Sequence, residues 1–304
     1  MKTGSARNWL GVSLIGLSAA SFGLITTQSR LAYDGGSTPL TLAFLRSVAF
    51  VAAFAPALVM LGRSLRLSRR GFLASIWMAV ALMAMSLGYL GSVFFIPVSL
   101  AALIFYTYPF YVAVLSRLAG REPLTAAKML ALATAFVGLA LALGPSFATL
   151  DWRGIALALA AAAGVAATNT FGGPIMREND PLAVNLWINL WMMLALGAYV
   201  VVNGTIVLPA TRTGTAGLIG ATACYLVAFT SWLLGLRAVS PIRAAVMFNI
   251  EPVVTIAIAW LVLGERLGPV QLLGGGLVIA AIVAMTFTGS RQPDAETRRR
   301  PSSA

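Results

Sequence analysis

The sequence AALIFYTYP at residues 101–109 returns as AAVMFNIEP at residues 244–252, with Ala, Ala, Phe and Pro at matching positions. The spacing between the two stretches is 143 residues, and the same spacing relates other Trp, Gly and Glu residues. These further pairs are Trp9 with Trp152, Gly11 with Gly154, Gly71 with Gly214, and Glu122 with Glu265. The chain is therefore predicted to consist of two copies of one unit.

The composition places both copies in a lipid bilayer. Of the 304 residues, 59% are hydrophobic and only 10% are charged, and the mean hydropathy is +0.89. A soluble domain carries about 25% charged residues, so the missing charge indicates that much of the surface faces lipid. A duplicated membrane domain is typical of secondary transporters, in which the substrate site lies between the repeats.

The residue types exclude several kinds of chemistry. The chain has no histidine and one cysteine, Cys224, so His-ligated metals, haem, and zinc or iron–sulfur sites are not expected. We therefore predict no metal and no cofactor. All four aspartates fall in loops or in the C-terminal tail, and no catalytic set of side chains is apparent. The chain is predicted not to be an enzyme.

The net charge of +12 raises the question of nucleic-acid binding. The basic residues, however, fall in loops and tails between apolar runs, which is the pattern of a membrane protein. We expect no nucleic-acid partner. The expected partners are a small-molecule substrate and the lipid bilayer, with the chain acting as a monomer or a weak homo-oligomer.

Ten apolar runs are long enough to cross a bilayer, for which about 20 residues are needed. They cover roughly 9–29, 39–61, 71–92, 97–118, 125–144, 152–171, 181–202, 214–236, 241–263 and 268–288. The predicted fold is an all-α membrane protein, with ten transmembrane helices around a central cavity. The predicted parts are a cytoplasmic N-terminus (1–8), a first repeat (9–145), a second repeat (152–288) and a disordered cytoplasmic tail (289–304).

The basic residues predict the orientation of these helices. If the N-terminus is cytoplasmic, 16 of the 21 Lys and Arg residues lie on the cytoplasmic side, four lie on the other side, and Arg46 lies within a span. This bias predicts a multi-pass protein of the cell (inner) membrane with both termini in the cytoplasm. Since five crossings per repeat is an odd number, the second repeat is expected to be inverted about a pseudo-two-fold axis.

Pro109 and Pro252 lie midway along the fourth and ninth runs, at equivalent positions of the two repeats. A proline lacks the backbone N–H group and leaves the carbonyl four residues earlier without its helical partner. Those carbonyls belong to Phe105 and Phe248. Helix breaks of this kind mark substrate sites in inverted-repeat carriers, and a kink that serves only packing is the alternative.

Two charged residues lie well inside the spans. Glu251 is ten residues into the ninth run, about 15 Å from its inner end, and Arg46 is seven residues into the second run, about 10 Å from its outer end. A charge at such depth costs several kcal/mol unless it is paired, hydrated or protonated. The two side chains are expected to hold a zwitterion or relay a proton, or else to link helices structurally.

Polar and aromatic residues near the two breaks, or at matching positions of the repeats, complete the candidate site. A carrier for a flat or amphipathic solute needs aromatic rings and a few hydrogen-bonding groups, although packing alone also explains single Tyr and Trp residues. The candidate substrate-binding residues are Glu251, Asn249, Tyr106, Tyr108, Tyr89, Trp232, Asn169 and Arg46, with Pro109 and Pro252 as helix breaks.

The end of the second repeat resembles the EamA family of the drug/metabolite transporter superfamily. The residues that carry the resemblance are Glu251-Pro252-Val253, then Leu263-Gly264-Glu265-Arg266-Leu267, then Gly274-Gly275-Gly276. The first repeat has a weaker version, Tyr108-Pro109 followed by Gly120-Arg121-Glu122-Pro123-Leu124. The resemblance covers about residues 9–288 and implies a ten-helix basket that most often exports amino acids or related small metabolites.

The predicted function is that of a secondary active transporter, an inner-membrane exporter of aromatic or apolar amino acids or related metabolites by alternating access. The alternative is a carrier of a flavin, an amine or a drug-like compound that works as an importer or facilitator. No Walker-type loop is present, so direct drive by ATP is not expected. Proton coupling, exchange and facilitation remain open.

Overall fold

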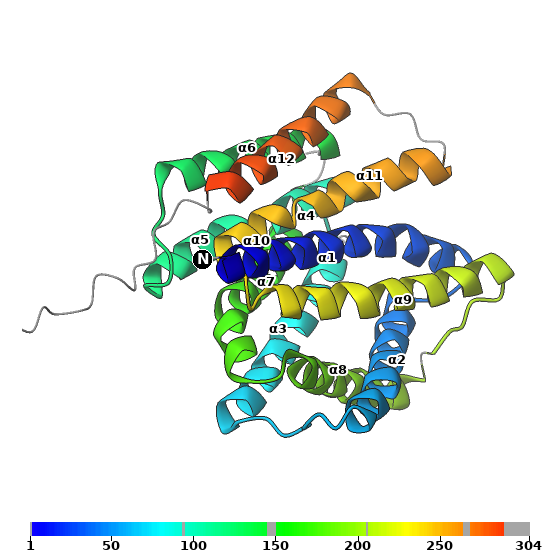
Figure 1. Ribbon diagram of the computed structural model, residues 1–304. Coiled ribbons are helices and arrows are strands. Elements are labelled where there is room, and N and C mark those ends of the chain that lie inside the picture. The colour runs from blue at the N-terminus through cyan, green and yellow to red at the C-terminus, as the bar shows by residue number, and fades with distance from the viewer. Residues whose placement is uncertain (1, 93–94, 145–149, 205, 264–267, 289–304) are drawn as a thin grey trace, which may run out of the picture.

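The computed structural model describes residues 2–92, 95–144, 150–204, 206–263 and 268–288. This part of the chain contains twelve α-helices and no β-strand (Figure 1). The helices are α1 (Lys2–Asp34), α2 (Pro39–Met60), α3 (Arg69–Ser92), α4 (Val98–Phe105), α5 (Tyr108–Leu118), α6 (Ala126–Leu143), α7 (Trp152–Glu178), α8 (Pro181–Asn203), α9 (Arg212–Gly235), α10 (Pro241–Met247), α11 (Ile250–Leu263) and α12 (Pro269–Thr288).

Local sequence determines where these helices begin and end. The Thr38 side chain accepts a hydrogen bond from the Thr41 N–H group at the start of α2, and Asp180 accepts one from Leu182 at the start of α8. Such caps satisfy amide groups that have no partner inside the helix. Helix α8 ends at Gly204, whose φ of 62° lies in the left-handed region that favours glycine.

Eight of the described helical stretches are long and apolar enough to cross a membrane. One of these stretches, Leu100–Leu118, runs through both α4 and α5. The fourth and ninth predicted runs therefore each consist of two helices, α4 with α5 and α10 with α11. The Gly264-Glu265-Arg266-Leu267 segment of the family resemblance and the tail 289–304 lie outside the described residues.

Two helices are longer than the sequence indicated. Helix α7 continues to Glu178 instead of ending near residue 171, and α1 begins at Lys2 and continues to Asp34. Helix α7 passes through Pro174 and ends before Asp180-Pro181, where α8 begins.

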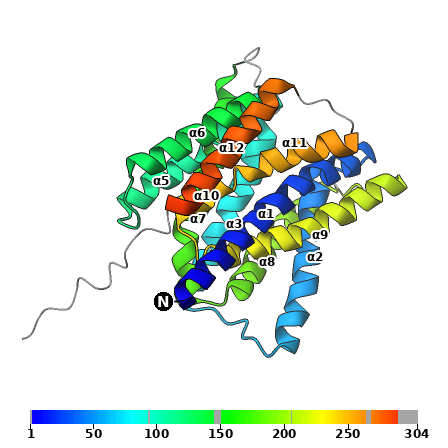
Figure 2. The same ribbon diagram turned by 45° about the horizontal axis from the view of Figure 1, so that its top comes forward.

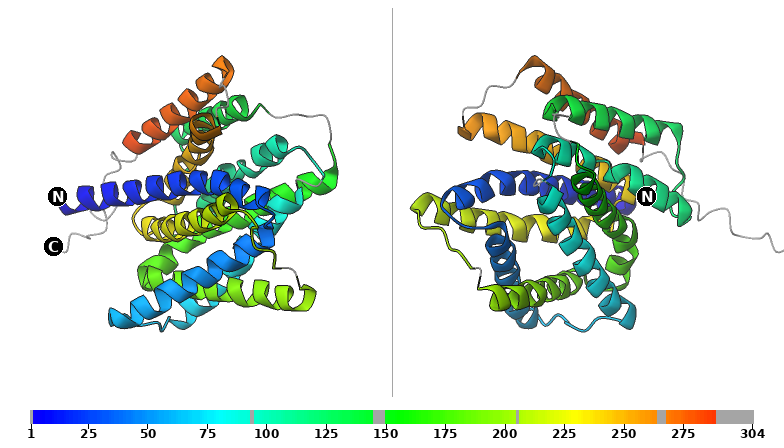
Figure 3. Two further views of the ribbon diagram at one scale, coloured as in Figure 1. Left: turned by 90° about the vertical axis from the view of Figure 1, so that its right-hand side faces the viewer. Right: turned by 180° about the vertical axis from the view of Figure 1, so that it is seen from behind.

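Contacts between helices occur in equivalent pairs: where a helix of the first copy packs on one of the second, the equivalent helices of the two copies pack together as well. Helix α1 packs on α9 as α7 packs on α3, and α11 packs on α1 as α5 packs on α7. In two pairs, α2 with α8 and α6 with α12, each helix packs on its equivalent in the other copy. These two pairs form opposite edges of the molecule (Figures 1 and 3). Figure 2 shows α1 and α9 side by side between these two edges. Such an exchange of contacts is what a two-fold relation between the copies produces.

Close backbone approaches show that the corresponding pairs run antiparallel. A Cβ atom added to Gly35, just beyond the end of α1, would lie 2.8 Å from the Gly214 Cα atom near the start of α9. A Cβ atom on Gly11, near the start of α1, would lie 2.7 Å from the Ala238 Cβ atom beyond the end of α9. The corresponding contacts of α3 with α7 are Gly71 with Asn179 and Gly88 with Leu157.

The edge formed by α6 and α12 depends on glycine in the same way. A Cβ atom on Gly138 would lie 2.7 Å from the Gly274 carbonyl oxygen, and one on Gly274 would lie 2.5 Å from the Ala142 amide nitrogen. Small residues allow helices in a membrane to approach this closely and to pack without voids. Gly138 and Gly274 therefore allow α6 and α12 to lie this close together.

Gly274→Ala is expected to destabilise the protein, because its methyl group pushes α12 away from the backbone of α6. Overpacking of this kind costs about 1–3 kcal/mol, and the melting temperature of the purified protein in detergent measures the loss. Gly276→Ala is the matched control, since a Cβ atom at Gly276 meets no atom within 4 Å. Equal melting temperatures for the two variants would contradict the close contact.

Candidate functional site

The two broken spans have the same construction. Between α4 and α5, the Thr107 N–H group donates to the Ile104 carbonyl at 3.1 Å, and between α10 and α11 the Asn249 N–H group donates to the Val246 carbonyl at 3.1 Å. Each bond spans three residues instead of four, so the helix tightens and changes direction. Pro109 and Pro252 follow in the first turn of α5 and α11, where a missing N–H group costs little.

The two carbonyls that precede the prolines differ. Among the described residues no backbone N–H group donates to the Phe105 carbonyl, as the missing N–H of Pro109 implies. The Phe248 carbonyl accepts a hydrogen bond from the Glu251 N–H group at 3.0 Å. The expectation of a free carbonyl at Phe248 was therefore wrong, because the tightened turn supplies a donor one residue before the proline.

The two breaks touch each other at the Ala245 carbonyl. The Tyr108 hydroxyl, from the first break, donates to this carbonyl at 3.2 Å, and the Asn249 amide, from the second break, donates to it at 3.3 Å. Asn249 also donates to the Val246 carbonyl at 3.1 Å. Both side chains are buried. The candidate residues Tyr108 and Asn249 thus join the two copies and satisfy backbone groups of the broken helix.

Glu251 lies in the first turn of α11, beside tyrosines of the first copy. The Tyr106 hydroxyl lies within hydrogen-bonding reach of the Glu251 carboxyl group, and the charge of that group acts on Tyr89 and Tyr108. The four residues come from three different helical spans. The structure therefore gathers Glu251, Tyr89, Tyr106 and Tyr108 into one cluster.

The rings of this cluster pack around Phe105. The sequence analysis considered only the backbone carbonyl group of this residue. The Phe105 ring lies 5.4 Å from the ring of Tyr89, 5.3 Å from that of Tyr106 and 5.7 Å from that of Tyr108. Tilted and edge-on contacts at these distances are favourable for aromatic rings. Phe105 thus fixes the positions of the three tyrosines that face Glu251.

Trp232 and Asn169 form a second group, which lies beside the second break. The Trp232 indole N–H group donates to the Asn169 side-chain oxygen at 3.2 Å, and the Asn169 amide donates to the Val165 carbonyl at 3.0 Å. The Trp232 ring lies 6.2 Å from that of Phe248, which belongs to the second break. Asn169 therefore orients Trp232 against the helix break.

Arg46 lies apart from Glu251, on the face of Tyr225. Its guanidinium carbon is 4.5 Å from the centroid of the Tyr225 ring, a cation–π distance. The ion pairs found among the described residues are Arg30 with Asp34, Arg63 with Asp180, and Lys128 with Glu122. In this conformation Arg46 and Glu251 are thus not joined as a pair.

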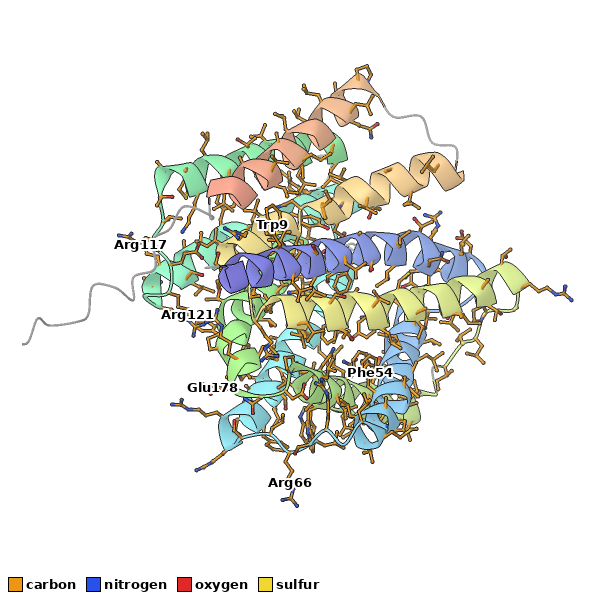
Figure 4. The ribbon with its side chains drawn as sticks, viewed as in Figure 1. Trp9, Phe54, Arg66, Arg117, Arg121 and Glu178 are labelled. Atoms are coloured by element: carbon orange, nitrogen blue, oxygen red, sulfur yellow. The ribbon has the colours of Figure 1, made fainter. Side chains whose placement is uncertain are left out.

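A run of aromatic rings nevertheless connects the neighbourhoods of these two charges. It begins on α2 with Phe54, which Figure 4 labels, and passes through Phe50, where successive rings lie 4.2–6.4 Å apart. Tyr225 and Phe229 stack at 5.2 Å, and Phe229 lies 5.4 Å from Trp232. From Trp232 the run reaches Phe248, three residues before Glu251. Sequence reasoning missed this run, because its rings come from two helices and from the second break.

Sequence reasoning also missed two buried asparagines on α8. The Tyr225 hydroxyl donates to the Asn189 side-chain oxygen at 2.9 Å, and the Asn189 amide donates to the Asn185 side-chain oxygen at 2.9 Å. Both asparagines are fully buried. Their spacing of four residues places them on one helix face, and this was the signal available in the sequence.

Five of the candidate residues are buried in this conformation. Two surface hollows are present, one of about 260 Å³ lined by Ala133, Thr134, Val137 and Leu277, and one of about 460 Å³ at residues 150–153. Neither contains a candidate substrate residue. Tyr106, Tyr108, Trp232, Asn169 and Asn249 are each at most 8% exposed, because their rings and amides pack against one another. In this conformation these five side chains face one another, and the central cavity stays a prediction.

One end of the molecule carries a set of contacts between the copies. The Glu122 carboxylate pairs with Lys128 at 2.7 Å and accepts a hydrogen bond from the Ser240 hydroxyl, beside the start of α10, at 3.1 Å. Arg121 donates to the Thr170 carbonyl of α7 at 2.7 Å. Figure 4 shows Arg121 at the same end as the N-terminus. Glu122 and Arg121 thus tie the loop after α5 to the second copy.

The described residues define a multi-pass helical membrane protein built from two copies of one unit. The chain belongs to the EamA-like transporter family, whose model matches residues 9–144 and again residues 152–287. Members of this family are transporters, which agrees with the prediction that the chain is not an enzyme. The two matches also agree with the repeat spacing of 143 residues found in the sequence.

Comparison with solved structures gives the same fold. A crystal structure, described only as that of a protein, superposes with a TM-score of 0.77 at 18% sequence identity. The match covers 94% of this chain and 99% of the other. At this identity the likeness concerns the fold alone. A search of the curated proteins found no match.

Glu122→Ala is expected to destabilise the folded protein, because it removes the carboxylate that pairs with Lys128 at a site where both side chains are at most 13% exposed. Removing one member of such a pair costs about 3 kcal/mol, and the melting temperature in detergent measures the loss. Glu178→Ala is the control, since Glu178 is an exposed carboxylate at the same end of the molecule (Figure 4). A Glu122→Ala variant as stable as Glu178→Ala would show that the link contributes nothing.

Proposed function

We propose that the protein is a secondary active transporter of the inner membrane that exports aromatic or apolar amino acids, or related small metabolites, by alternating access. The observation that carries this proposal is the meeting of two helix breaks beside a single carboxyl group. Glu251, the three tyrosines and the aromatic run to Arg46 provide two opposite charges separated by rings. A zwitterion with an apolar side chain matches that arrangement.

The arrangement of helices supports ten crossings in two inverted repeats. If α4 with α5 and α10 with α11 each count as one broken span, the twelve helices correspond to ten crossings. The antiparallel contacts of α1 with α9 and of α3 with α7 are those that an inverted second copy makes. Arg117 and Arg121 lie at the end that carries the N-terminus (Figure 4), in agreement with a cytoplasmic N-terminus.

Contacts at both ends of the molecule suit a closed intermediate of alternating access. At one end, Glu122 links the first copy to the start of α10. At the other end, the Ala210 N–H group donates to the Gly35 carbonyl at 2.8 Å, and the Val207 N–H group donates to the Thr41 hydroxyl at 3.0 Å. Breaking one set of contacts while keeping the other exposes the central residues to one side of the membrane at a time.

Each candidate residue has a proposed role in this scheme. Glu251 binds the ammonium group of the solute or a proton in its place, which permits proton antiport. Tyr89, Tyr106 and Tyr108 supply rings and hydroxyl groups around that carboxyl group. The remaining residues shape the other side: Trp232 packs against the apolar part of the solute, Asn169 orients Trp232, and Asn249 holds the second break.

A carrier for organic amines is the second candidate. Three tyrosines around one carboxyl group also suit a cationic amine, because aromatic faces attract cations. Flavins and other drug-like compounds, moved as an import or a facilitated flux, belong to the same alternative. Arg46 distinguishes the candidates, since an amine without a carboxylate gives this cation no counter-ion.

Counterflow in proteoliposomes tests the proposal. Vesicles preloaded with unlabelled L-phenylalanine are expected to take up external labelled L-phenylalanine faster than empty vesicles do, because a carrier returns its loaded site more readily than its empty site. Protein-free vesicles are the control. Trans-stimulation by phenethylamine or riboflavin in place of every amino acid would favour the second candidate.

Glu251→Gln is expected to slow L-phenylalanine exchange by about tenfold or more, because a charge-assisted contact to the substrate is lost. If Glu251 carries a proton, the variant also loses the pH dependence of net transport. Exchange is measured in the same vesicles, with Glu178→Gln as a control that removes an exposed carboxylate. Wild-type exchange with wild-type pH dependence in Glu251→Gln would remove Glu251 from the mechanism.

A further inference from the structure

We propose that Arg46, which lies over the ring of Tyr225 and is backed by the buried Asn189–Asn185 pair, is a carboxylate-binding site, so that the cargo carries a carboxylate. This inference rests on the proposed transport function and names the class of its substrate. It also assigns the two charges separate tasks: Arg46 binds the anionic end of the solute, and Glu251 binds the cationic end or a proton.

Within the part of the chain that the structure describes, no acidic residue pairs with Arg46. The residue is half-buried in α2, and the ion pairs found among the described residues do not include it. Its Nε atom is buried and has no hydrogen-bond acceptor. A guanidinium group in a membrane span costs several kcal/mol when it is unpaired, so an anionic ligand at this place is strongly favoured.

An aromatic ring of α9 packs against the guanidinium group. Tyr225 of α9 lies under it at 4.5 Å, and the charge of Arg46 also acts on the Tyr33 hydroxyl of α1. The planar guanidinium group stacks on aromatic faces and keeps its edge free for the two oxygens of a carboxylate. In this geometry the N–H groups of the Arg46 guanidinium are available to a ligand, and the tyrosine ring does not neutralise the charge of Arg46.

The network behind Tyr225 also lacks an acceptor. Tyr225 donates to Asn189, and Asn189 donates to Asn185. The Asn185 side-chain nitrogen is buried and has no hydrogen-bond partner. The two unpaired groups of this network, on Arg46 and Asn185, are therefore both N–H donors. Unsatisfied buried donors are rare in native proteins, and a surplus of donors indicates a ligand that supplies oxygen atoms.

The repeat shows that this cation is not part of the shared scaffold. With the one-residue slippage that aligns Pro39 with Pro181, Arg46 corresponds to Ile188, a fully buried apolar residue of α8. Helices α2 and α8, which are equivalent helices of the two copies, pack on each other. The first copy thus places a cation where the second copy places a hydrocarbon side chain. A charge that only supported the fold would be expected in both copies.

Two probes that each carry one half of an aromatic amino acid test the site. 3-Phenylpropionate has the carboxylate without the amine, and phenethylamine has the amine without the carboxylate. At neutral pH, 3-phenylpropionate is expected to raise the melting temperature of the wild-type protein in detergent in a saturable way. Arg46→Gln is expected to weaken the apparent affinity for 3-phenylpropionate by about tenfold or more, and to leave the response to phenethylamine unchanged.

Two further variants separate the charge of Arg46 from its shape and from protein folding. Arg46→Lys keeps the charge but loses the planar fork, so its response to 3-phenylpropionate is expected to fall between those of the wild type and Arg46→Gln. Arg30→Gln removes an exposed cation, paired with Asp34 in α1, and is expected to respond as the wild type does. Arg46→Lys also tests the site if Arg46→Gln does not fold.

The outcomes distinguish this inference from the proposed function. A wild-type protein that 3-phenylpropionate does not stabilise, or an Arg46→Gln or Arg46→Lys variant with the wild-type response, overturns the carboxylate site. If counterflow of L-phenylalanine occurs while Arg46 has no effect on 3-phenylpropionate, transport stands and the site is wrong. If the Arg46-dependent response occurs without counterflow of any amino acid, the carboxylate site stands and amino acid transport is wrong.

Discussion

A bilayer offers no water to a backbone N–H or C=O group, and the rest of this structure depends on how two interrupted helices meet that constraint. The Ala245 carbonyl accepts from Tyr108 of the first copy and from Asn249 of the second. The side chains that satisfy one break therefore also hold the two copies together. The consequence is a polar centre in an apolar protein, and Glu251 lies beside it because its own N–H group completes the turn at Phe248.

The scaffold and the site use the repeat in opposite ways. Contacts that build the fold occur twice: glycines bring α1 against α9 and α3 against α7, and a proline follows each break. The groups proposed to bind the solute occur once. Tyr108 corresponds to Glu251, Arg46 corresponds to Ile188, and the Asn185–Asn189 pair belongs to the second copy alone. A two-fold scaffold thus holds an asymmetric site, which is what a solute with two different ends requires.

The fold could be predicted further than the site. Apolar runs located the spans, and prolines located the breaks at Tyr106–Thr107 and Phe248–Asn249, because both signals are local. The length of α7 was underestimated, since the helix continues through Pro174 to Glu178. The burial of the candidate residues, the role of Phe105 and the partner of Arg46 were not predictable, because each depends on residues from different helices.

By itself, the sequence determined that the chain is a duplicated, all-helical membrane protein with two proline breaks and two deep charges. Periodicity, composition and repeat spacing are properties of the chain alone, and the bilayer converts them directly into structure. The tertiary structure decided that Glu251 meets tyrosines and that Arg46 meets Tyr225 and not Glu251. Partners of buried groups are set by how helices cross and pack, and no local pattern records that arrangement.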